Sequence, residues 1–133
     1  MPRIVTGPAE AQWTVVALCA EWCGTCRDYF TAFAQRAERN PGTRHLWIDI
    51  EDDSEWLGDI DLETLPSLLI LRDAQPMFYG AVLPHIDVLE RTLRALVEHG
   101  ATSNAVPAEQ RESVEHIVTQ LIRARHLSPR PSQ

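Results

Sequence analysis

Short runs of apolar, largely β-branched residues recur along the chain and predict buried strands. The run WTVVALCA is continuous rather than alternating, which is typical of a strand that is covered on both faces. Three further runs follow it, and the last two are separated by a short turn that predicts a hairpin. The predicted strands are Trp13 to Ala20, His45 to Ile50, Ser67 to Leu71 and Met77 to Tyr79.

Between and after these runs, the apolar spacing changes to a helical period, with charged residues on the opposite face. Gly100 ends the second such segment, and a polar linker separates it from the third. The predicted helices are Glu21 to Asn40, His85 to His99 and Pro107 to His126. The stretch from Asp49 to Glu63 holds eight carboxylates and no basic residue, so we expect a solvated helical turn and loop there.

The order of these elements predicts the fold class. Strands and helices alternate along the chain, and a hairpin follows before the last two helices. Alternation of this kind favours an α/β fold with a mixed sheet and helices on both faces.

Composition and charge narrow the functional classes. A chain of 133 residues with 44% hydrophobic and 23% charged residues is expected to form one globular domain. Its net charge of -7 repels phosphate backbones and anionic lipids, which disfavours nucleic acid and membrane partners. All the basic residues are arginines, so Schiff-base, lysine-base and P-loop chemistry are excluded.

The apolar runs are too short to suggest a membrane protein. The longest lies near Val15 to Ala20, whereas a bilayer-spanning helix needs roughly 20 apolar residues. We therefore expect neither a signal peptide nor a membrane helix. We expect a cytoplasmic location.

The three cysteines, Cys19, Cys23 and Cys26, lie within eight residues, a grouping that indicates redox or metal chemistry. Cys23 and Cys26 form a C-x-x-C motif where the first strand turns into the first helix. Free backbone N–H groups at a helix start stabilise a thiolate at Cys23, which makes it the expected nucleophile. Cys26, one turn later, is the expected resolving thiol. Zinc needs two further ligands, and because no second cysteine pair exists we predict no metal site.

The segment Ala20 to Arg27, AEWCGTCR, resembles the active-site segment of the thioredoxin family. The sequence TLPS at Thr64 to Ser67 is similar to the cis-proline loop of that family, and the element order agrees from about Trp13 to His99. The resemblance implies a thioredoxin-like fold with a mixed sheet of about four strands flanked by helices. It also implies that no cofactor is needed beyond a redox-active disulfide between Cys23 and Cys26.

The resemblance further implies a substrate-binding surface around the two cysteines. In this sequence that surface would consist of Trp22, Gly24, Thr25, Leu65 and Pro66. The backbone of Leu65 would pair with an extended peptide, Pro66 would be a cis residue facing the disulfide, and Trp22 would form an aromatic wall.

Several positions depart from the family pattern. Thr25 stands where a proline is usual, and the family's buried carboxylate would fall at Ala17. The lysine often paired with that carboxylate aligns with His45, which makes His45 a candidate proton shuttle; the alternative is a strand-end histidine in contact with solvent. The N-terminus is also shortened, with Arg3 to Thr6 as the one candidate for an opening strand.

Cys19 has two interpretations of its own. The first is a small buried hydrophobe on the strand, because free cysteine is among the most buried residue types. The second is a ligand in the C-x3-C-x2-C spacing of iron–sulfur radical enzymes that use a sulfonium cofactor. Those enzymes need a much larger barrel, so we favour the first.

The end of the chain leaves the function open. We expect residues 1–100 to form the thioredoxin-like domain and residues 101–133 a helical extension. The apolar stripe of residues 107–126 must be buried against that domain, a second copy of the chain or a client protein.

Two functions are consistent with the sequence. The leading one is a thiol-disulfide oxidoreductase that reduces or exchanges protein disulfides and draws electrons from a thiol reductant or a reductase. The alternative is a thioredoxin-fold assembly chaperone or interaction module with little turnover, which the loss of the carboxylate at position 17 favours.

Overall fold

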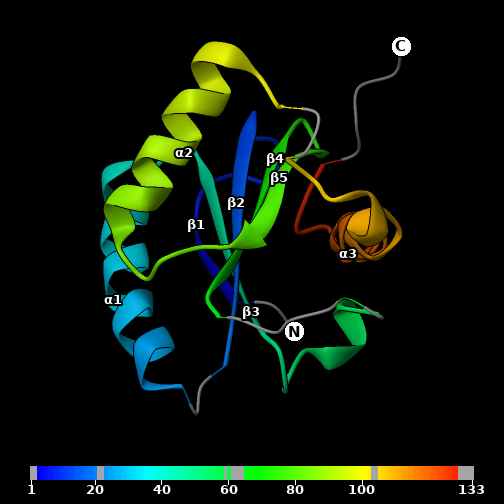
Figure 1. Ribbon diagram of the computed structural model, residues 1–133, viewed down its shortest axis with the longest axis horizontal. Coiled ribbons are helices and arrows are strands. Elements are labelled where there is room, and N and C mark those ends of the chain that lie inside the picture. The colour runs from blue at the N-terminus through cyan, green and yellow to red at the C-terminus, as the bar shows by residue number, and fades with distance from the viewer. Residues whose placement is uncertain (1–2, 21–22, 59, 61–64, 103–104, 129–133) are drawn as a thin grey trace.

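The computed structural model describes residues 3–20, 23–58, 60, 65–102 and 105–128. Its centre is a five-stranded mixed sheet with the strand order β1-β3-β2-β4-β5 (Figure 1). The strands are β1 (Arg3–Thr6), β2 (Trp13–Cys19), β3 (Arg44–Asp49), β4 (Ser67–Arg72) and β5 (Gln75–Ala81). The α-helices are α1 (Gly24–Arg39), α2 (Ile86–His99) and α3 (Arg111–Arg123), with short 3-10 turns at Ser54–Trp56 and Ala108–Gln110.

The sheet has the mixed topology that the sequence predicts. Strands β2 and β3 are parallel, joined through α1, whereas β4 runs antiparallel to β2 and pairs with β5 as a hairpin. The strand count is five rather than about four, because β1 pairs antiparallel with β3 at the sheet edge. An edge strand of four residues has little of the apolar run that identifies a buried strand.

Helices cover both faces of the sheet, as expected. In Figure 1, α1 and α2 lie on one side of the strands and α3 lies on the other. Successive side chains of a strand point to opposite faces. In β2, Val15, Ala17 and Cys19 therefore join the core beneath α1 and α2, while Val16 and Leu18 join the core beneath α3.

The third helix packs on the sheet of its own chain. Its apolar stripe, formed by Val114, Ile117, Val118 and Leu121, is buried in one core with residues of β2, β3 and β4. Within the residues that the structure describes, no helix is long and apolar enough to cross a membrane.

The acidic stretch after β3 is less solvated than expected. Asp53, Trp56 and Leu57 are buried, and both apolar side chains belong to the core beneath α3. The many carboxylates of this stretch predict a solvated segment. Trp56 and Leu57, however, supply apolar area that packs into the core. Residues 59 and 61–64 of this stretch lie outside the described part of the chain.

Candidate active site

Three cysteines meet where β2 ends and α1 begins. Cys19 is the last residue of β2, and the following turn is closed by a hydrogen bond from the Cys23 N–H to the Ala20 carbonyl, with an N···O distance of 3.1 Å. Cys23 is the N-cap of α1, in extended backbone conformation, and its side chain makes no capping hydrogen bond. Cys26 lies in the first turn of the helix and faces the sheet.

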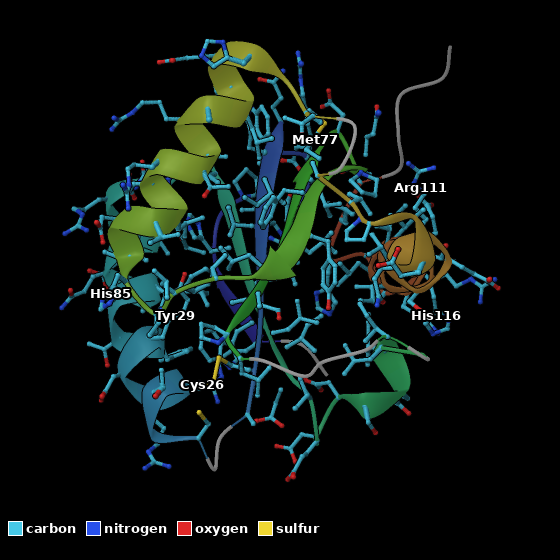
Figure 2. All side chains as sticks on the ribbon, in the orientation of Figure 1. Cys26, Tyr29, Met77, His85, Arg111 and His116 are labelled. Carbon is cyan, nitrogen blue, oxygen red and sulfur yellow. A yellow bond between two sulfur atoms is a disulfide. The ribbon has the colours of Figure 1, made fainter. Side chains whose placement is uncertain are left out.

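A disulfide joins Cys19 to Cys26 and leaves Cys23 as a half-buried free thiol. The two sulfur atoms are 2.20 Å apart and the two Cα atoms 5.7 Å apart, and Figure 2 shows this bond beside Cys26 at the start of α1. The structure therefore does not contain the Cys23–Cys26 disulfide that the family resemblance implies.

The position of the side chains explains this pairing. Cys19 and Cys26 are 0% and 1% exposed and both belong to the core beneath α1 and α2, whereas Cys23 only borders that core. The interpretation of Cys19 as a simple buried hydrophobe missed its bond. The available signal was its place at the end of a strand that turns directly into the helix carrying Cys26.

The loop before β4 reaches the same end of the sheet. Ser67 pairs with Leu18 in antiparallel register, so Pro66 comes level with Cys19. The Leu65–Pro66 peptide bond is cis, and the Pro66 carbonyl accepts a hydrogen bond from the Val82 N–H at 3.0 Å. Leu65 packs against the core that holds both bonded cysteines.

The structure describes some of the other residues expected at the substrate surface and not others. Gly24 and Thr25 are exposed on the first turn of α1. Trp22 and Thr64 lie outside the described residues.

An open cavity of about 440 Å³ adjoins the cysteines and carries charges of both signs. Cys26 and Phe30 line it together with Arg27, Asp49 and Asp53. Its carboxylates are held by the backbone: Asp53 Oδ2 accepts a hydrogen bond from the Asp49 N–H at 3.0 Å, and Asp49 caps the turn that follows β3. In the described part of the chain, no group of three or more potential ligand side chains could hold a metal ion.

The structure does not bring His45 to the cysteines. His45 pairs with Val15 at the start of β2, four residues before Cys19, which corresponds to about 13 Å along a strand. Its ring is 0% exposed, with Nε2 2.7 Å from Arg36 Nη1 and Nδ1 3.0 Å from the Thr43 carbonyl. Burial, with a smaller contribution from the Arg36 charge, lowers the pKa of His45 to about 4.

The Arg36 contact also fixes the protonation of this ring. A guanidinium only donates, so Nε2 of His45 accepts and Nδ1 carries the proton that it donates to Thr43. Arg36 is in turn paired with Glu90 of α2. The ring thus belongs to a buried polar cluster, and Ala17, where the family has its carboxylate, is fully buried in the apolar core.

The sequence of residues 5–93 matches the family model named Thioredoxin. This chain belongs to the thioredoxin family. Among curated relatives, it is 30% identical over 59 residues to a thioredoxin H-type of Oryza sativa subsp. indica, covering 44% of this chain and 48% of the relative. It is 29% identical over 69 residues to a thioredoxin H-type of Populus jackii, covering 50% of each.

Solved thioredoxins share this fold. A thioredoxin of Fasciola hepatica superposes with a TM-score of 0.58 at 19% identity, covering 65% of this chain and 82% of the other. A poplar thioredoxin h gives 0.58 at 22% identity, covering 66% and 78%. The chain spans about half the length of the first curated thioredoxins that it matches, so the likeness establishes family and fold.

Proposed function

We propose that this chain is a thiol-disulfide oxidoreductase that reduces or exchanges disulfides in protein substrates, with Cys23 as the attacking thiol and Cys26 as the resolving thiol. One observation carries the proposal: a free, partly accessible thiol lies at the N-cap position of α1, next to a cysteine pair close enough to form a disulfide. Membership of the thioredoxin family supports the same chemistry.

The reaction starts from the reduced protein. The Cys23 thiolate, at the N-cap of α1, attacks one sulfur of the substrate disulfide and releases the other as a thiol. Cys26 then attacks the Cys23 sulfur and releases the substrate's second thiol. Cys23 at the N-cap and Cys26 three residues later occupy positions whose side chains can approach each other at a helix start.

The substrate would bind across the end of the sheet. Gly24 and Thr25 expose the first helical turn, and the cis Leu65–Pro66 bond lies level with Cys19 at the same edge. An extended peptide that pairs with the Leu65 backbone would bring its disulfide toward Cys23. Trp22, which lies outside the described residues, is proposed as the aromatic wall from its position in the motif alone.

Electrons would come from a thiol reductant or a reductase. A related solved structure is a complex of ferredoxin:thioredoxin reductase with thioredoxin f2, which covers 71% of this chain with a TM-score of 0.60 at 14% identity. We propose a partner of that general kind and a reducing compartment such as the cytosol, since the three cysteines have no distant partner to bridge.

Insulin reduction by dithiothreitol tests the proposal. The wild-type chain should accelerate the precipitation of reduced insulin, and Cys23→Ser should lower the rate to that of dithiothreitol alone. Thr119→Ser, an exposed change on α3, is the matched control and should act like wild type. Equal rates for Cys23→Ser and the wild type would contradict the oxidoreductase function and favour the alternative, a chaperone or interaction module.

A further inference from the structure

The disulfide in this structure uses a cysteine outside the C-x-x-C motif. Cys26 is bonded to Cys19 of β2, and Cys23 keeps a free thiol at the N-cap of α1. Cys26 thus has one potential partner on each side, a partly exposed one before it in the helix turn and a fully buried one on the strand.

We propose that Cys19 is a second resolving cysteine. It attacks Cys26 in the Cys23–Cys26 disulfide, so that the disulfide moves to the buried Cys19–Cys26 pair and Cys23 is released. The inference rests on the proposed function, because Cys23 and Cys26 must first be oxidised by a substrate. It assigns to Cys19 a reaction step that the C-x-x-C motif alone does not have.

The step is a thiol-disulfide exchange. Cys19 gives up its proton to solvent and its sulfur attacks Cys26 Sγ. The Cys19–Cys26 bond forms, the Cys23–Cys26 bond breaks, and Cys23 leaves as a thiolate that can take up a proton from solvent. In the whole cycle two cysteine thiols are oxidised to one disulfide and the substrate disulfide is reduced to two thiols. No further oxidant is needed, because the exchange itself moves no net electrons.

The surroundings of the sulfur atoms favour this direction. A disulfide carries no charge and is suited to the core, where Cys19 and Cys26 are 0% and 1% exposed. The departing sulfur of Cys23 lies at the N-cap of α1 and is partly accessible to solvent, whereas Cys19 is fully buried. The opposite arrangement would leave the ionisable thiol in the core.

Burial also determines how the protein is reduced again. Cys19 and Cys26 are 0% and 1% exposed, so an external thiol reaches their sulfur atoms much more slowly than it reaches Cys23, although Cys26 borders the open cavity. The fast route is therefore for Cys23 to attack Cys26 and return the disulfide to the partly exposed pair. Cys23 is therefore needed both to oxidise and to reduce the buried bond. A purely structural disulfide would form and break without it.

The position of the disulfide can be mapped by cleavage after glutamate. Cleavage after Glu10, Glu21 and Glu38 places Cys19 in peptide 11–21 and both other cysteines in peptide 22–38. The reduced full-length chain is mixed with bis(2-hydroxyethyl) disulfide, quenched with acid at intervals, alkylated with N-ethylmaleimide, digested and analysed by mass spectrometry.

In the wild type, an early species should carry the disulfide within peptide 22–38 and the label on Cys19. It should convert to a late species in which the two peptides are linked and the label is on Cys23. Cys19→Ser should stop at the early species. A wild-type end product with the label still on Cys19 would overturn the inference while leaving the oxidoreductase function intact, whereas no oxidation at all would overturn both.

Re-reduction separates the exchange from a structural bond. The Cys23→Ser chain, oxidised at Cys19 and Cys26 in guanidinium chloride and then refolded, should lose this bond to dithiothreitol about tenfold more slowly than the wild type, or slower still. In guanidinium chloride, which exposes both cysteines, the two rates should be equal. Equal rates in the native state, or formation of the Cys19–Cys26 bond in Cys23→Ser as fast as in the wild type, would overturn the inference.

Discussion

At the scale of single residues, the buried His45 and Arg36, together with the partly exposed Glu90, link the sheet to both helices on one face. Arg36 of α1 contacts Nε2 of His45 on β3 and pairs with Glu90 of α2. A protonated His45 would place an N–H against the guanidinium, so the cluster requires a neutral ring. The charge state of one imidazole is therefore coupled to the stability of the fold.

This coupling predicts a loss of stability in mild acid. The pKa of His45 is about 4 in the folded chain and near 6.5 when unfolded, so between these values only the unfolded chain binds the proton. The free energy of unfolding should fall by about 3 kcal/mol from this group as the pH drops from 7 to 4. Urea unfolding across this range measures it.

A matched pair of histidine variants isolates the effect. His45→Gln should remove the His45 part of the pH dependence and leave that of His126, whose pKa burial also lowers. His99→Gln, on an exposed histidine at the end of α2, should leave the pH dependence unchanged. The same slope in both variants would contradict the role assigned to the buried ring.

Gly7, just after β1, occupies a position where both the backbone conformation and the lack of space require glycine. Its φ is +100°, and an added Cβ would lie 2.5 Å from the Thr43 carbonyl oxygen and 2.6 Å from Arg44 Cα. Gly7→Ala should therefore destabilise the protein by about 2 kcal/mol or more, since it combines backbone strain with contact against rigid backbone. Gly42→Ala, which meets nothing within 4 Å, is the control for thermal unfolding, and equal costs would contradict this account.

At the scale of elements, the sequence was most informative where burial was uniform. Strands β2, β3 and β4 were predicted because each is an apolar run buried on both faces. The sequence predicts strand β1 less clearly, because a four-residue edge strand depends on its pairing with β3. The bond between Cys19 and Cys26 could not be predicted from the motif, because it depends on which face of α1 meets the end of β2.

The third helix is predicted to be a structural part of the core. Leu121→Ala removes a fully buried side chain beneath the sheet and should cost about 2–5 kcal/mol of unfolding free energy. Thr119→Ala, on the exposed face of the same helix, should change it by less than about 0.5 kcal/mol. If Leu121→Ala instead split an assembly without lowering the stability of the monomer, α3 would be an interface.

At the scale of the whole molecule, the cores on the two faces of the sheet differ in the residues that they hold. The α3 face holds an apolar core with no cysteine among its described residues, and the α1 and α2 face holds the three cysteines and the cluster around His45. The parallel strands β2 and β3 direct their C-terminal ends to the cavity beside Cys26. The proposed reaction therefore takes place at the C-terminal ends of β2 and β3, in a sheet that helices cover on both faces.

The most direct test of this account is to trap its first covalent intermediate. Cys26→Ser removes the resolving thiol, so insulin should remain attached to the chain through a mixed disulfide that digestion after glutamate maps to Cys23 in peptide 22–38. The double variant Cys23→Ser, Cys26→Ser should capture none. A mixed disulfide on Cys19 in peptide 11–21, or no mixed disulfide at all, would contradict the central claim that Cys23 is the attacking thiol.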